Sequence, residues 1–286
     1  MSTYAISDVH GCFDQLRQLL DVVSPTSDDE VWMLGDLLDR GPQSAEALVW
    51  ATTEAPGNFH FLLGNHEDMA GCVISRDPVD VELHGGWGLE PEDVWSYNGG
   101  WETADQLCER TDADWRVSVL EPWMRGLVPF APVTVGDKDL MLVHAGFDPR
   151  QWDERARFVS EGLDDPRAHR ERLEVGCGFG AQWEQDMVWA RQGWYDYEGD
   201  LPRLTIFGHT PTTYLARFVE QERSWLRHTG EAEDVDAWWH GIPSEPGRIW
   251  HGSQRIDIDC GCAYGGRLAA LRLDDMEEFY VDGLEE

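Results

Sequence analysis

The chain has 286 residues, of which 42% are hydrophobic and 27% are charged, and its formal net charge at pH 7 is −33. This length allows one large domain or two ordinary ones, and it is sufficient to bury most of the apolar surface. So negative a surface repels polyanions, which excludes nucleic acid and anionic membranes as favourable partners.

Targeting signals and cysteine usage give two further expectations. The N-terminal residues contain no basic region followed by an apolar core, and no apolar run reaches the ~18 residues of a membrane span. The six cysteines fit neither a disulfide scaffold nor a zinc pair. We therefore expect a cytoplasmic protein with reduced cysteines.

Short apolar runs alternate with helical periodicity in the first part of the chain. The runs have the length and composition of strands, and the segments between them repeat their apolar residues at helical spacing. This β-α-β-α-β-α order predicts a parallel sheet. The predicted strands are 3–6, 31–35 and 59–64, and the predicted helices are 12–23, 44–54 and a third from about Glu67.

The remaining chain adds helices and then more strands. Residues 76–126 have mainly helical periodicity, and the stretch 150–190 has no clear pattern. No Pro- or Ser-rich linker divides the chain. We therefore expect one domain over residues 1–286, with a tryptophan-bearing insertion at about 212–253. The later predicted strands lie in 127–135, 139–146, 204–207, 255–275 and 277–283.

Metal-type side chains follow the predicted strands. Successive groups after the first three strands are roughly 30 residues apart, the length of one βαβ unit. Parallel strands would therefore deliver them to the same edge of the sheet, where α/β proteins bind ligands. One such residue alone indicates little, but five strand ends carry them: Asp8 and His10, Asp36, Asn65 and His66, His144, and His209.

The chemistry of this set is that of a transition-metal centre. Imidazoles mixed with carboxylates and an amide suit Mn, Fe, Zn or Co better than Ca or Mg. There are more ligands than one ion can use, and two ions about 3.5–4 Å apart can clamp a phosphoryl oxygen. Arg40 stands beside the ligands and supplies a bidentate fork for a phosphate group.

The blocks that carry these residues resemble a known family. "SDVHG", "GDLLDRG", "GNHE", "VHAG" and "GHTP" are similar, in order, to the signature blocks of the calcineurin-like metallophosphoesterases. "YNGG" at 97–100 and "IDCGCAYGGRLAALRL" near the end resemble the phosphoprotein-phosphatase branch, which includes bacterial and bacteriophage Ser/Thr protein phosphatases and symmetrical diadenosine tetraphosphate hydrolases. The resemblance implies an α/β fold: a β-sandwich flanked by α-helices.

The resemblance also implies roles for individual residues. Asp8 and His10 would bind the first metal, Asp36 would bridge both metals, and Asn65, His144 and His209 would bind the second. A hydroxide bridging the two metals, expected to be Mn, would attack phosphorus. His66 would be the general acid, oriented by Asp39. The phosphate would be held by Arg40, Arg191, Asn65 and Tyr264, with Arg191 placed by its similar segment "MVWARQG".

Three interpretations of the function follow. The first is a Ser/Thr-type protein phosphatase or phosphomonoesterase that acts on phosphoproteins or small phosphate esters. The alternative is a hydrolase of dinucleoside polyphosphates, in which tryptophans of the 212–253 insertion could line a pocket for the bases. The third is a metal-binding regulatory protein without catalysis, which would have no need of the proton donor His66. The insertion is either a surface elaboration or a wall that selects substrates.

Overall fold

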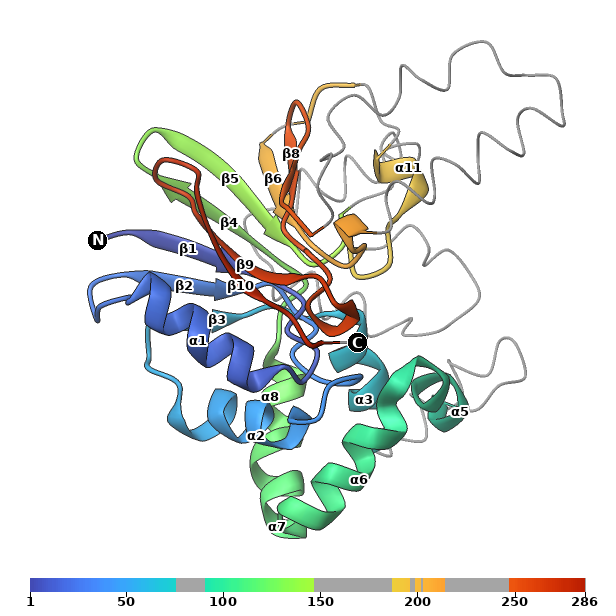
Figure 1. Ribbon diagram of the computed structural model, residues 1–286. Helices are drawn as coiled ribbons and strands as arrows, with labels where there is room; N and C mark the ends of the chain where they lie inside the picture. The colour runs from blue at the N-terminus through green and yellow to red at the C-terminus, as the bar shows by residue number, and fades with distance from the viewer. Residues whose placement is uncertain (76–90, 147–186, 196–198, 202, 214–246, 286) are drawn as a thin grey trace, which may run out of the picture.

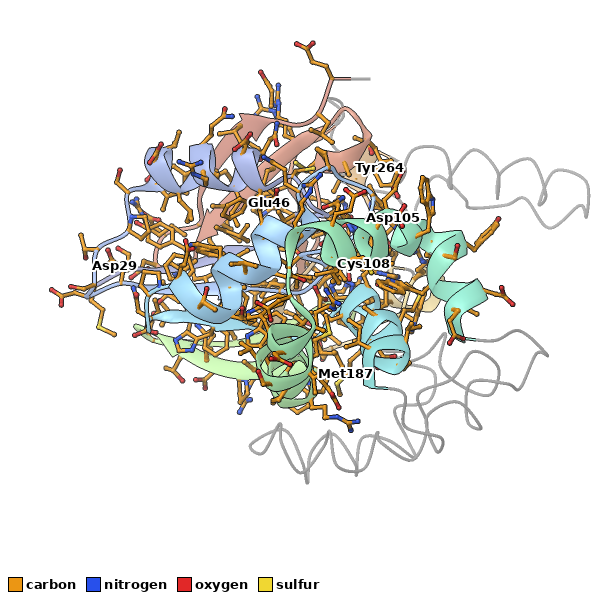
Figure 2. All side chains as sticks on the ribbon, turned by 90° about the horizontal axis from the view of Figure 1, so that it is seen from below. Asp29, Glu46, Asp105, Cys108, Met187 and Tyr264 are labelled. Carbon is orange, nitrogen blue, oxygen red and sulfur yellow. The ribbon has the colours of Figure 1, made fainter. Side chains whose placement is uncertain are left out.

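The computed structural model describes residues 1–75, 91–146, 187–195, 199–201, 203–213 and 247–285 (Figure 1). The predicted insertion therefore lies largely outside the described residues, as does the 150–190 stretch up to 186. The single domain with an insertion stays a prediction. Within the described part of the chain, no helix is long and apolar enough to cross a membrane. The five cysteines described there are free, and Cys108 is exposed on the surface (Figure 2).

Two five-stranded mixed sheets form the centre of the molecule (Figure 1). In the first sheet, β1, β2 and β3 pair in parallel, as predicted, and β9 pairs antiparallel with β1. In the second, β5, β6 and β8 are parallel. The first sheet has the order β10 (Glu277–Asp282), β9 (Arg267–Arg272), β1 (Thr3–Ile6), β2 (Glu30–Met33), β3 (Phe59–Phe61), and the second β4 (Phe130–Val135), β5 (Lys138–Val143), β6 (Leu204–Phe207), β8 (Arg255–Asp257), β7 (Trp250–His251).

Helices cover the outer faces of the two sheets (Figure 1). α1 packs against β9 and β10, and α11 lies beside the second sheet. π-helical turns extend α2 over 50–54 and join later helices over 96–100 and 116–120, and a 3-10 turn covers 262–264. The helices are α1 (Phe13–Val23), α2 (Ser44–Val49), α3 (Asn65–Ser75), α5 (Pro91–Trp95), α6 (Trp101–Arg110), α7 (Ala113–Trp115), α8 (Glu121–Gly126) and α11 (Gln192–Tyr195).

Side-chain alternation along the strands builds the layers. In β1, Tyr4 and Ile6 belong to the core beneath the helices, whereas Ala5 belongs to the core between the sheets. In β5, Leu140 packs between the sheets and Met141 packs on the opposite face. Successive side chains of a strand point to opposite faces of its sheet, so each central strand contributes to the core on each side of its sheet.

Two sequence expectations need correction. The third helix begins at Asn65 rather than near Glu67, so both Asn65 and His66 lie in its first turn. Asn is a common cap residue, and this makes the start of a helix ambiguous in a sequence. Trp250, counted with the aromatic insertion, is a buried residue of β7 and packs 5.5 Å from the ring of Tyr195. It is therefore part of the core of the second sheet.

Candidate active site

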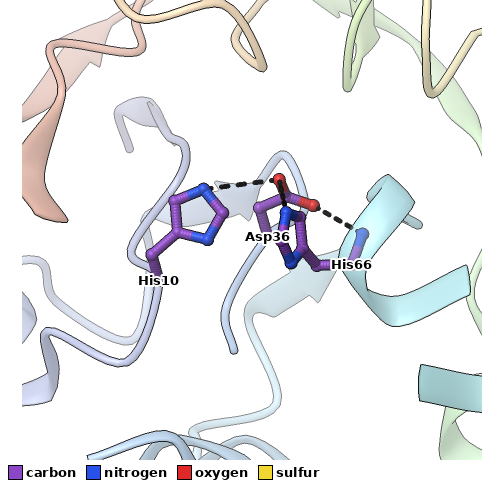
Figure 3. Close-up of side chains that lie close together, drawn as sticks. All are labelled: His10, Asp36 and His66. Carbon is purple, nitrogen blue, oxygen red and sulfur yellow. Dashed lines mark hydrogen bonds and ion pairs between the residues drawn. The ribbon is translucent and has the colours of Figure 1, made fainter. Parts of the chain in front are cut away.

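The residues that follow the strand ends converge on Asp36. Figure 3 shows His10, from the loop after β1, and His66, at the start of α3, directed at the carboxylate of Asp36, which follows β2. His10 Nε2 lies 3.5 Å and His66 Nε2 3.9 Å from Asp36 Oδ2. His144, which follows β5, places Nε2 3.4 Å from Asp36 Oδ1. One carboxylate thus lies between imidazoles delivered by both sheets.

Asn65 organises the other side of the cluster. Its Oδ1 lies 2.9 Å from His144 Nε2 and 2.9 Å from His209 Nδ1. Asp8 lies next to the first side, with Oδ1 3.9 Å from His10 Nε2, and both of its carboxylate oxygens accept a hydrogen bond from the backbone N–H of His209. The structure therefore brings together all six residues predicted to bind metal.

The donor set fits divalent transition metals. Two groups have ligand atoms that all lie within 4.8 Å of one another, and both contain Asp36: one with His10 and His66, the other with His144 and His209. Every member is buried, and the ring nitrogens of His10, His66 and His144 lie 3.4–3.9 Å from the Asp36 oxygens, a spacing close to that of two donor atoms that share one ion at about 2.0–2.2 Å. By distance the first group also admits His66 as a ligand, whereas the family resemblance gives it the role of general acid.

Burial and charge set the protonation of these groups in the absence of a cation. Burial raises the pKa of the Asp36 carboxyl, but the imidazoles of His144 and His66 outweigh it and hold that pKa well below its usual value. For His144, burial lowers the pKa, but Asp36 outweighs burial and raises it to about 9. Asp36 is thus the anionic centre of the site.

The backbone at the site is strained. Positive φ in a residue other than glycine is uncommon and costs about 1–3 kcal/mol, and such residues cluster at active sites. Most of those in the described structure lie in the loops after β1, β2 and β6. They are Asp8, His10, Asp36, Asp39, Arg40 and His209, with φ between 47° and 74°.

Glycines permit the close approach of these loops. A Cβ on Gly64 would lie 2.2 Å from Asp36 Oδ1, and one on Gly208 would lie 2.1 Å from Asp8 Oδ2. Gly64 is not among the residues with positive φ. It therefore serves the site by leaving room for the carboxylate, not by adopting a left-handed backbone conformation.

His66 and Asp39 form a buried pair. His66 Nδ1 lies 2.6 Å from Asp39 Oδ2, so this nitrogen carries the proton that the carboxylate accepts. The other ring nitrogen, Nε2, is buried and has no hydrogen-bond partner among the residues that the structure describes. The backbone N–H of Asp39 donates to the hydroxyls of Ser44 and Thr103, which fixes the loop after β2.

The predicted phosphate-binding residues lie around the same cluster. Arg40 Nη1 is hydrogen-bonded to His10 Nε2, and the Arg40 guanidinium carbon lies 5.1 Å from the centre of the Tyr264 ring. Tyr264 thus contacts the arginine that is predicted to bind the phosphate. Burial, and then the charge of Arg191, hold the pKa of His209 well below its usual value, so Arg191 is close enough to act on the site.

Glu67 is a site residue that the sequence analysis missed. Its carboxylate accepts hydrogen bonds from the backbone N–H groups of Asp36 at 2.8 Å, Leu37 at 2.7 Å and Gly64 at 3.0 Å. It therefore ties α3 to the loop that carries Asp36. Burial, and next the charge of Asp36, raise its pKa to about 8. The quoted "GNHE" block contains this residue, but only its neighbours have obvious metal chemistry.

A family model described as "Calcineurin-like phosphoesterase" matches residues 1–258 of the chain. The chain belongs to this family. It is a phosphoester hydrolase, and the fold and the family resemblance predicted from the sequence are confirmed. The His and Asp groups described above are compatible with the metals that define a metallophosphoesterase.

Curated relatives carry a nucleotide hydrolase name. A "Bis(5'-nucleosyl)-tetraphosphatase, symmetrical" of Chromobacterium violaceum is 29% identical, covering 98% of this chain and 94% of its own. A protein of the same name from Erwinia tasmaniensis is 36% identical, covering 98% and 96%. A crystal structure of a putative diadenosine tetraphosphatase covers 99% of this chain and 94% of its own with 17% identity and a TM-score of 0.55, which supports the fold.

These relatives change the order of the interpretations made from the sequence. The protein-phosphatase interpretation, placed first, is less supported than the alternative, hydrolysis of dinucleoside polyphosphates. The metal-binding protein without catalysis is set aside, because the chain belongs to a family of hydrolases.

Proposed function

We propose that this chain hydrolyses dinucleoside tetraphosphates symmetrically, releasing two nucleoside diphosphates. The observation that carries the proposal is that the Asp36-centred cluster occurs in a chain that matches symmetrical tetraphosphatases along 98% of its length. Such a substrate is a polyanion, and the chain is strongly acidic. Local positive charge is therefore needed at the site to bind it.

Two divalent or trivalent transition-metal ions would supply part of that charge, together with Lewis acidity and an activated water for attack on phosphorus. The proposed ligands divide into two sets that share Asp36. Asp8 and His10 would bind one ion, while Asn65, His144 and His209 would bind the other. The mixed nitrogen and oxygen donors favour Mn, with Fe, Zn or Co as alternatives.

The arginines would orient the polyphosphate. Arg40 lies next to the cluster, held between His10 and the ring of Tyr264, and its guanidinium can contact two phosphate oxygens at once. The pKa of Arg191 is lowered, first by desolvation and also by the charge of Arg40. A phosphate between these two arginines would relieve their mutual repulsion.

His66 would act as the general acid. Asp39 fixes the proton on Nδ1, and the unpartnered Nε2 would deliver its own proton to the oxygen that leaves phosphorus. The breaking P–O bond leaves its electron pair on that oxygen, which the proton neutralises. The 3.9 Å between His66 Nε2 and Asp36 Oδ2 leaves this nitrogen free to face a reacting group.

Product analysis with diadenosine tetraphosphate tests the proposal. Purified protein reconstituted with Mn should convert this substrate to ADP alone, since symmetrical cleavage gives two identical halves. A phosphoserine peptide and p-nitrophenyl phosphate, assayed under the same conditions, provide the comparison. Equal amounts of AMP and ATP, or a kcat/KM that is higher for the phosphopeptide, would overturn the proposal.

A further inference from the structure

Trp95 makes a contact with the His66–Asp39 pair that the ligand set does not explain. It is the last residue of α5, its side chain is buried, and it precedes the "YNGG" segment. Its indole Nε1–H donates a hydrogen bond of 2.8 Å to Asp39 Oδ2. The same oxygen is bound by His66 Nδ1 at 2.6 Å.

The geometry gives this contact control over the carboxylate. The indole and the imidazole both donate to Oδ2 of the Asp39 carboxylate, and among the described residues the other oxygen, Oδ1, is buried without a hydrogen-bond partner. Within this part of the structure, the indole and the imidazole are therefore the side chains whose hydrogen bonds oppose rotation of the carboxylate. If the indole N–H were lost, only the imidazole would define the direction in which Asp39 points.

The two glycines of "YNGG" allow the segment to pack closely on Trp95 and Arg40. A Cβ on Gly100 would lie 2.4 Å from three atoms of the indole ring, so a side chain at this position would displace the ring. Gly99 has a φ of 97°, and its Cβ would lie 3.2 Å from Arg40 Cγ. The segment therefore packs on the indole on one side and on the phosphate-binding arginine on the other.

We propose that Trp95 is a positioning residue for proton donation: its indole N–H holds the Asp39 carboxylate so that His66 keeps Nδ1 protonated and directs Nε2 at the leaving oxygen. In the step that it supports, the P–O bond breaks, its electron pair goes to the leaving oxygen, and that oxygen takes the proton from Nε2. The inference rests on the proposed general-acid role of His66 but not on the identity of the nucleotide.

The test uses Trp95→Phe, which removes the N–H and keeps an aromatic ring. The readout is kcat for a series of aryl phosphates whose leaving groups differ in basicity, since basic leaving groups depend most on protonation. We expect kcat to fall about 10-fold for phenyl phosphate and less than about 3-fold for p-nitrophenyl phosphate. These losses are smaller than the loss of about 10²–10⁴-fold expected when a general acid is removed entirely. KM and metal content should stay unchanged.

Trp50→Phe is the matched control. Trp50 is an aromatic residue of the core on the helix side of the first sheet, where its ring packs against those of Phe13 and Phe59. It should show no dependence on the leaving group. If Trp95→Phe behaves like Trp50→Phe, or lowers kcat equally along the series, Trp95 has a packing role only and the proposal is wrong.

Two further variants keep the test decisive. In an Asp39→Asn background, Trp95→Phe should cost no additional activity, because the contact that it removes is already altered; additive losses would contradict the proposal. If Trp95→Phe fails to fold, Gly100→Ala, which crowds the indole, should reproduce the same leaving-group dependence. A wild type that is inactive on diadenosine tetraphosphate would overturn the proposed substrate and leave this inference standing.

Discussion

Two buried acidic clusters lie near each other in this molecule, and their chemistry is opposite. Around Asp36, imidazoles hold the pKa of the carboxyl well below its usual value, so the group is an anion. In the second cluster, at the end of β8, burial raises the pKa values of Asp257 and Asp259 well above their usual range. Tyr195 donates a hydrogen bond of 2.5 Å to Asp257 there.

The difference shows what keeps a buried carboxylate ionised and able to bind a metal ion. Both clusters are withdrawn from water, and burial alone disfavours the charged form. Only the Asp36 cluster has several imidazoles around the carboxylate. The second has a phenol and backbone N–H groups, among them the N–H of Asp259, which donates to Asp257 Oδ1 at 3.0 Å. The two carboxyls of the second cluster, without imidazoles around them, are therefore held in the protonated form.

The largest effect is expected for Asp36→Asn. The amide would weaken the contact to both ions, since Asp36 belongs to both ligand groups. Metal ions stabilise the transition state by several kcal/mol, and each 1.36 kcal/mol changes the rate by a factor of ten. We therefore expect kcat/KM to fall by about 10⁴-fold or more. Metal analysis after Mn reconstitution should give two equivalents for the wild type and less than one for the variant. Saturation of the wild type at one equivalent would exclude the dinuclear site.

His66→Asn should separate chemistry from metal binding. The two ions should remain, because Asp8, His10 and the Asn65 group are intact, while kcat should fall by about 10²–10⁴-fold. Elemental analysis beside steady-state kinetics distinguishes the two effects. If the variant loses one metal equivalent, His66 is a ligand in the group that it forms with His10 and Asp36, and not the acid.

Asp257→Asn probes the second cluster and should affect stability rather than activity. In the folded protein the pKa of Asp257 is raised, so the native state binds a proton that the unfolded chain releases above about pH 3.9. Wild-type stability therefore declines as the pH rises above that value, and the neutral amide removes this decline. The melting temperature of the variant relative to wild type should increase from pH 4 to pH 8. A constant difference would mean that Asp257 is ionised.

The smallest effect is expected for Asp29→Asn, far from both clusters. Asp29 and Tyr264 lie on opposite sides of the view in Figure 2. Hydrogen bonds from Thr26 and Ser2 lower the pKa of Asp29 to about 2. The pKa of Asp29 in the unfolded chain is about 3.9. The stabilisation that its carboxylate gives the folded protein is therefore fully present above that pH and is lost as the pH falls through about 2. The variant should melt a few degrees below wild type at pH 7, and the gap should close in acid.

The metal-type residues that the structure brings together could be found in the sequence because each follows a strand and lies in a short contiguous block. Asp8, Asp36 and His144 could be placed at one sheet edge from strand order alone. Trp95 could not, since it lies 56 residues from Asp39 and an indole has no catalytic chemistry of its own. Glu67 was missed for a related reason: its role is to bind backbone N–H groups, which leave no pattern in a sequence.

The loop residues with positive φ create a conflict between stability and activity. At Asp36, Asp39 and His209, positive φ costs free energy that a glycine at the same position would not cost, but glycine lacks the carboxylate or imidazole. Glycine substitutions that relax these loops would therefore raise stability and remove the side chains proposed to act in the site. Engineering for heat resistance in this fold should leave the loops after β1, β2 and β6 untouched.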